Sequence, residues 1–199
     1  MNLTGVSVSS PSENLILVSP DDEFIGTTTK VEAHQPGGLL HRAFSVFLVT
    51  PEGHVLLHER SRLKPLWPGY WTNSCCSHPR HGESYNEAAH RRTYEELGIA
   101  TPLTEIYQFE YQAHFKTVGS EHELCKVYVG CVDQETQVSP HPEEVHAWDW
   151  FHIEEVNELV AASPQVFTPW FLLEWQALRT EHTQRVQAVL KPRGPSAQH

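Results

Sequence analysis

The chain has 199 residues and a formal net charge of −11, with 25 acidic side chains against 14 Lys and Arg. This length is enough for one domain with a sizeable core, and an acidic chain without a basic run is a poor partner for nucleic acid. We find no signal peptide and no long apolar run, so we expect no membrane partner and a cytoplasmic location that keeps the four cysteines reduced.

The first predicted elements are strands. Residues 1–12 are rich in Ser and small side chains and are predicted to form a disordered tail. Residues 15–18 are a short apolar run, and a Pro-Asp-Asp-Glu turn leads from it to a return strand at residues 24–26. Residues 43–49 and 54–60 are β-like and flank a Pro-Glu-Gly turn, which predicts a hairpin.

A helix over residues 84–97 is the clearest single element. Ser84 is a good N-cap, Glu87 three residues later completes a capping box, and Gly98 ends the helix. Thr168 and Pro169 are typical of the N-cap and first turn of a final helix. The remaining predicted elements are strands at 106–115, 123–132 and 145–151, a short helix at 153–162, and a disordered tail at 189–199.

Strands and helices are mixed along the chain, with hairpins instead of regular βαβ repeats. This order favours an α+β fold in which helices flank a mixed sheet. We therefore predict one domain over residues 13–188.

The most informative segment, residues 71–79, reads Trp-Thr-Asn-Ser-Cys-Cys-Ser-His-Pro. In an extended chain, alternate side chains share a face, so Cys76 and His78 point the same way and Cys75 points the other way. A reactive thiol and a metal-ligating imidazole can therefore share one pocket.

His78 and four further acidic and imidazole groups form a candidate metal site. Glu121 and Glu123 lie two apart in a β-like segment, so both carboxylates face one side. By donor type alone the set suits Zn, Mn, Fe or Mg, and the alternative is two loop histidines beside a solvated edge. The candidate ligands are His34, His41, His78, Glu121 and Glu123.

Residues 71–79 resemble the TNSxCxHP signature of type 1 isopentenyl-diphosphate isomerases, and the resemblance extends over about residues 15–175. It implies a Nudix-like fold, an α/β/α sandwich, in which the five candidate ligands hold a divalent metal. The metal expected is Mg or Mn, with Zn as an alternative, and no flavin or NAD takes part.

The predicted helix also resembles the end of a Nudix box, through Glu83, Arg91, Glu95, Glu96, Gly98 and Ile99. The sequence departs from that box at Ser77, where the box has Gly, and at Arg92, where it has Glu. The loss of a Mg²⁺-binding carboxylate argues against pyrophosphate hydrolysis, and a guanidinium offers a bidentate phosphate contact instead. The alternative for Arg92 and Glu96 is an ordinary surface ion pair.

The resemblance implies isomerisation of a small diphosphate by a 1,3-proton shift, in which Glu123 with Tyr111 protonates the alkene and Cys76 as thiolate removes a proton. The reverse assignment of acid and base stays open. Glu96 and the Cys76 backbone carbonyl are expected to hold a second Mg²⁺ with the substrate. Trp170 either covers the carbocation or simply packs in the core. The implied substrate-binding residues are Lys30, Arg60, Lys64, Arg92 and Trp170.

Two other classes of protein remain: a Nudix-type hydrolase, and a redox or zinc-binding module built on Cys and His. Arg92 counts against the first class, and the absence of a CxxC pair counts against the second. The sequence leaves the oligomeric state open between a monomer and a weak dimer.

Overall fold

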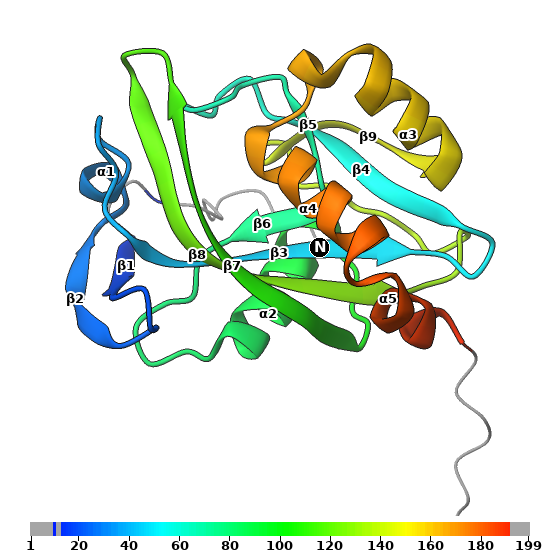
Figure 1. Ribbon diagram of the computed structural model, residues 1–199, viewed down its shortest axis with the longest axis horizontal. Helices are drawn as coiled ribbons and strands as arrows, with labels where there is room; N and C mark the ends of the chain where they lie inside the picture. The colour runs from blue at the N-terminus through cyan, green and yellow to red at the C-terminus, as the bar shows by residue number, and fades with distance from the viewer. Residues whose placement is uncertain (1–9, 11–12, 192–199) are drawn as a thin grey trace, which may run out of the picture.

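The computed structural model describes residue 10 and residues 13–191, which contain one mixed β-sheet with helices on both faces (Figure 1). This confirms the predicted α+β class. The strands are β1 (Asn14–Val18), β2 (Phe24–Thr29), β3 (His41–Val49), β4 (His54–Arg60), β5 (Trp71–Thr72), β6 (Cys75–Ser77), β7 (Leu103–Phe115), β8 (Gly119–Cys131) and β9 (Val145–His152). The helices are α1 (Lys30–Ala33), α2 (Tyr85–Leu97), α3 (Ile153–Ala162), the 3₁₀ turn η1 (Pro164–Val166), α4 (Pro169–Thr180) and α5 (Thr183–Leu190).

Strand β3 lies at the centre of the sheet and is buried on both faces. Its residues Phe44, Val46 and Leu48 pack with α2, whereas Phe47 and Val49 pack on the opposite face with α3 and α4. Side chains alternate along a strand, so a nearly continuous apolar run fills two cores at once. The sequence of β3 therefore specifies an α/β/α sandwich.

The predicted hairpin of β3 and β4 is correct at its turn and wrong beyond it. Within the described residues the two strands are paired at Val49 and Val55. Beyond that pair, the same edge of β3 pairs with β6 and the same edge of β4 pairs with β5, while β8 and β9 pair along their other edges. The two strands therefore separate instead of forming a continuous ladder.

A polar segment fills the wedge between the separated strands. The Leu48 N–H donates to Ser74 Oγ at 2.8 Å, and the Ser74 hydroxyl donates to the Leu56 carbonyl at 2.6 Å. The Asn73 side-chain amide donates to the carbonyls of Val46 and Cys75. Ser74 thus supplies a hydrogen-bond partner to each strand at the point where the direct ladder ends.

The predicted helix boundaries agree closely with the structure. Ser84 caps α2 through a complete capping box with Glu87, and Gly98 ends the helix with a φ of 71°. Thr168 precedes α4 as predicted, but its hydroxyl donates to Thr72 Oγ1 at 2.9 Å instead of capping the helix.

Several boundaries and elements were not predicted. Helix α5 runs to Leu190, so the C-terminal tail predicted at 189–199 begins too early, and its residues 192–199 lie outside the described residues. The predicted tail at 1–12 lies outside them as well, except for residue 10. Helices α1 and α5 were missed because both are short. No helix among the described residues is long and apolar enough to span a membrane.

Replacement of Ser74 by Ala tests the wedge. The change leaves the Leu48 N–H and the Leu56 carbonyl buried without their partner, so we expect the free energy of unfolding to fall by about 1–3 kcal/mol. Urea denaturation measures this change. Ser163→Ala is the control, since that hydroxyl makes no helix-capping hydrogen bond, and we expect it to alter stability by less than about 0.5 kcal/mol. An equal loss in both variants would contradict the bridging role.

Candidate active site and metal centre

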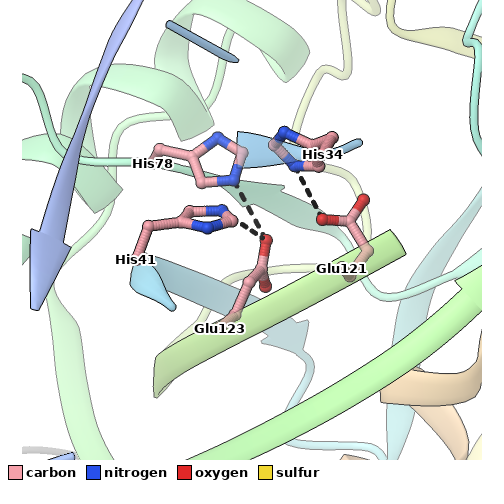
Figure 2. Close-up of side chains that lie close together, drawn as sticks. All are labelled: His34, His41, His78, Glu121 and Glu123. Atoms are coloured by element: carbon pink, nitrogen blue, oxygen red, sulfur yellow. Dashed lines mark hydrogen bonds and ion pairs between the residues drawn. The ribbon is translucent and has the colours of Figure 1, made fainter. Parts of the chain in front are cut away.

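The five candidate metal ligands meet at one point, as the sequence predicted. One ligand atom from each of them lies within 4.8 Å of all the others. Figure 2 shows the three imidazoles and two carboxylates converging, with His34 beside Glu121 and with His41 and His78 beside Glu123. The alternative of loop histidines and a solvated edge is wrong for these residues.

Strand pairing positions four of the five candidate ligands. His41 opens β3 and pairs with Glu123 of the parallel strand β8, while Glu121 lies two residues earlier on the same face of β8. His78 directly follows β6, which pairs with β3.

His34 comes from the other side, as the C-cap of α1. Its carbonyl accepts a hydrogen bond from the Ser120 N–H at 3.0 Å, which ties the helix end to the start of β8. A Cβ at Gly119 would lie 2.4 Å from that same carbonyl oxygen, so a larger residue would push His34 out of place.

The chemistry of the cluster fits a divalent metal. The Nδ1 atoms of His34 and His41 lie 2.6 and 2.7 Å from the carbonyls of Lys30 and Leu39. Since a carbonyl only accepts, each Nδ1 carries the proton and each Nε2 offers a lone pair. Those Nε2 atoms lie 2.7 Å from Glu121 Oε2 and 3.6 Å from Glu123 Oε1.

Two of these converging atoms have no hydrogen-bond partner among the described residues. His41 Nε2 and Glu121 Oε2 are buried and make no hydrogen bond within the described residues, which is unfavourable unless something else binds them. Ligands on opposite sides of such an ion are about 4.2 Å apart, so the cluster needs little contraction to bind one.

Cys76, Glu123 and Tyr111 all border one cavity of about 420 Å³. The Tyr111 hydroxyl donates to Glu123 Oε2 at 2.6 Å. Cys75 lies instead in the core beneath α2, as the alternation of β6 predicted. Burial raises the pKa of the Cys76 thiol to about 12, and the Arg60 guanidinium, 3.8 Å from Sγ, opposes that rise.

The predicted phosphate-binding cations border the same cavity, namely Lys30, Arg60, Lys64 and Arg92. Burial lowers the pKa of Lys30, and the nearby Lys64 and Arg92 lower it further. Arg60 is held by the carbonyls of Leu66 and Trp67. All four cations line the cavity, although the whole chain is acidic, and we refer to this set of four as the cation wall.

Trp170 lies in the core and at the cavity at once. Its ring packs against Trp67 with a centroid separation of 5.2 Å, and the Arg60 guanidinium lies 5.1 Å from its ring centroid. The Trp170 ring therefore packs in the core, which was one of the two alternatives for this residue, and it also borders the cavity.

Arg92 and Glu96 do not form a surface ion pair. Both side chains are 2% exposed, and the Arg92 Nη2 lies 2.6 Å from Glu96 Oε1 and 3.3 Å from Glu144 Oε1. Burial lowers and the carboxylates raise the pKa of Arg92, with a net rise. The partner Glu144 was missed because it lies outside the helix that carries the box.

His58 and Glu174 are two more buried polar residues that the sequence reasoning missed. His58 borders the cavity, and burial beside Arg60 lowers its pKa to about 4, so it is neutral and bonds through Nδ1 to the Ser74 carbonyl. Glu174 is fully buried on α4, and Cys125 Sγ lies 3.7 Å from its Oε1. The β-like and helical patterns of these segments gave no sign of either role.

Comparison with known proteins agrees with this fold and site. The family model described as "NUDIX domain" matches residues 39–171. Among solved structures, a protein of Deinococcus radiodurans matches with a TM-score of 0.67 and 23% identity over 82% of this chain and 98% of its own. A MutT NUDIX hydrolase from Burkholderia pseudomallei matches with a TM-score of 0.55 and 20% identity over 69% of this chain and 96% of its own. The chain is therefore a NUDIX-domain protein.

Similarity to proteins of known name identifies the family within the NUDIX-domain class. "Isopentenyl-diphosphate Delta-isomerase 1" of Photorhabdus laumondii is 41% identical over 85% of this chain and 97% of its own length. "Isopentenyl-diphosphate Delta-isomerase" of Serratia proteamaculans is 43% identical over 87% of this chain and 95% of its own. Within the NUDIX-domain proteins, the chain belongs to the isopentenyl-diphosphate Delta-isomerase family.

The metal centre leads to a prediction about metal content. We expect His34→Ala, His41→Ala and His78→Ala each to lower the divalent metal bound by the purified chain at least about tenfold, because each removes one of five converging donors. Elemental analysis after dialysis measures this. His90→Ala, on α2 outside the cluster, is the control and should retain the metal. Full occupancy in all three variants would disprove the site.

Glu174 makes stability depend on pH. Burial raises its pKa from 4.5 to about 8, so the folded chain keeps a proton that the unfolded chain releases at lower pH. Stability is therefore lost as pH rises from about 5 to 8, by an amount of about 3 kcal/mol at pH 7. We expect Glu174→Gln to abolish this loss, so that its advantage over the wild type grows between pH 5 and 8 in urea denaturation.

The control for this prediction is Glu158→Gln, which removes an exposed carboxylate on α3. It should leave the pH dependence of stability unchanged. If Glu174→Gln also follows the wild-type pH dependence, the buried carboxyl is not the source of that dependence.

Proposed function

We propose that this chain interconverts isopentenyl and dimethylallyl diphosphate, transposing a C=C bond by a 1,3-proton shift in isoprenoid biosynthesis. The observation that carries this proposal is a single cavity bordered by a thiol, by a tyrosine-bound carboxylate and by a wall of cations. The family membership given above supports it. A diphosphate needs the cations, and a proton shift needs two groups that exchange protons at separate carbons.

The proton transfers fall to residues that border this cavity. We assign Glu123 with Tyr111 to protonation of the terminal alkene carbon, and Cys76 to removal of the allylic proton. In the reverse direction the same two groups exchange roles. The short Tyr111–Glu123 hydrogen bond orients that carboxyl, and Arg60 beside the thiol stabilises its anion.

A divalent ion held by the five converging ligands would increase the acidity of the Glu123 carboxyl. Carboxylate and imidazole donors suit Mg or Mn, with Zn as the alternative. We further propose that Glu96 and the Cys76 backbone carbonyl hold a second Mg²⁺ that binds together with the substrate diphosphate. Both residues border the cavity beside Arg92 and Lys64.

The proposed substrate-binding residues also border this cavity. Lys30, Arg60, Lys64 and Arg92 would hold the diphosphate, whose charge they complement. Trp170 would lie beside the hydrocarbon and stabilise positive charge that develops on it. Flavin and NAD have no part in this chemistry. The chain is proposed to act in the cytoplasm, as a monomer or a weak dimer, without nucleic acid or membrane.

A single assay separates this function from diphosphate hydrolysis, the second candidate. The purified, metal-loaded chain is incubated with isopentenyl diphosphate, and both dimethylallyl diphosphate and released phosphate or pyrophosphate are followed. We expect isomerised product without phosphate release, because Arg92 replaces a carboxylate that NUDIX hydrolases use to gather Mg²⁺. Phosphate release without isomerised product would overturn the proposal in favour of the hydrolase.

The adjacent cysteines provide a matched pair of variants. Cys76→Ala removes the thiol that borders the cavity and should lower the isomerisation rate by at least about 10³-fold, with metal content retained. Cys75→Ala removes a thiol in the opposite core and should have a mild effect on rate. Product formation and metal content are measured for both. Loss of activity in Cys75→Ala but not in Cys76→Ala would show that the wrong thiol was assigned.

A further inference from the structure

Glu144 is a buried carboxylate on the cation wall of the cavity. It lies in the loop before β9, where its N–H donates to the His141 carbonyl and its own carbonyl accepts from the Ser61 N–H at 2.9 Å. The His141 N–H in turn donates to the Glu96 carbonyl at 2.8 Å. The loop is therefore tied both to the end of α2 and to the segment that carries Lys64, and the carboxylate is held in place between them.

The Glu144 carboxylate pairs with two of the cations proposed to bind diphosphate. Its Oε2 forms an ion pair with Lys64 Nζ, and its Oε1 lies 3.3 Å from Arg92 Nη2. The side chains of Lys64 and Arg92 are 16% and 2% exposed, so water screens these pairs less than surface pairs. Burial raises the pKa of Glu144, but Lys64 and Arg92 outweigh burial and bring it to about 2.

A diphosphate that enters this wall must compete with carboxylates. An N–H donor directed at Glu144 is not available to a phosphate oxygen at the same time. Arg92 also faces Glu95 Oε2 at 3.3 Å and Glu96 Oε1 at 2.6 Å, so its guanidinium is surrounded by carboxylates. A phosphate oxygen that takes the Nη2 donors of Arg92 therefore has to displace Glu96 or Glu144 from them.

We propose that Glu144 is a positioning residue that competes with the diphosphate for Lys64 and Arg92, and so weakens the binding of substrate and product alike. This inference rests on the proposed function. Substrate and product carry the same diphosphate, so binding energy from that group is uniform and does not accelerate the proton transfers. If the diphosphate is held too tightly, product release becomes slow. A carboxylate that returns to the two cations favours release.

Binding of inorganic pyrophosphate tests the competition directly. We expect the metal-loaded full chain carrying Glu144→Gln to bind Mg-pyrophosphate about tenfold more tightly than the wild type in titration calorimetry. Glu144→Asp keeps the charge but withdraws the carboxylate by one methylene, so we expect a smaller tightening in the same direction. In steady-state assays, KM and kcat of Glu144→Gln should fall together, whereas a merely structural defect would raise KM or leave it unchanged.

Glu95→Gln is the matched control. It removes the same charge from another carboxylate that pairs with Arg92, but Glu95 is 30% exposed and does not pair with Lys64 among the described residues. We expect its pyrophosphate affinity to stay within about twofold of the wild type.

Unchanged or weaker pyrophosphate binding by Glu144→Gln would overturn the proposal, and so would equal tightening in Glu95→Gln. Thermal unfolding identifies a variant that does not fold. If Glu144→Gln does not fold, the test is made with Glu144→Asp. A dissociation constant of Glu144→Asp for Mg-pyrophosphate equal to that of the wild type then overturns the proposal. Pyrophosphate binding is measured without turnover, so it tests Glu144 separately from the proposed function. If the variants show the expected affinities but the wild type does not isomerise isopentenyl diphosphate, the proposed function is refuted and the role of Glu144 is supported.

Discussion

Strand β3 pairs in parallel with β8 over its whole length, from His41 opposite Glu123 to Val49 opposite Cys131. This register sets the candidate site, because it places the imidazole of one proposed metal ligand directly beside the carboxylate that is both a proposed ligand and the proposed acid. The other edge of β3 pairs with β6, with Ser45 opposite Cys76. Opposite residues of paired strands share a face. One central strand therefore fixes the distance between the two groups that would exchange protons with the substrate.

The separation of β3 from β4 makes room for this arrangement. If the two strands formed a full hairpin, β6 would have no place beside β3, and Cys76 would not reach the cavity. The Asn73 and Ser74 side chains satisfy the backbone groups that the separation exposes. Two residues of the segment 71–79 are thus structural, while Cys76 and His78 carry the proposed chemistry.

Much of the site could be predicted because its residues lie in short, patterned segments. Alternation in β6 and β8 placed Cys76 with His78 and Glu121 with Glu123, and the capping box located α2. What could not be predicted depends on contacts distant in sequence. The turn between β3 and β4 suggested a hairpin because the competing partners, β6 for β3 and β5 for β4, are specified elsewhere in the chain. The burial of Arg92 was missed for the same reason, since helical spacing shows its neighbours on α2 and not the loop that covers it.

The departure of α2 from a NUDIX box has a structural consequence beyond the loss of one carboxylate. A guanidinium that is 2% exposed needs carboxylates around it, since an unpaired buried charge is strongly destabilising. Glu95 and Glu96 of the box meet this need from α2, and Glu144 supplies a further carboxylate from the loop before β9. Glu144 in turn pairs with Lys64, so the change at Arg92 links α2 to the loop after β4. Arg92 thus belongs to a network of paired charges that joins α2 to the loop after β4 and to the loop before β9.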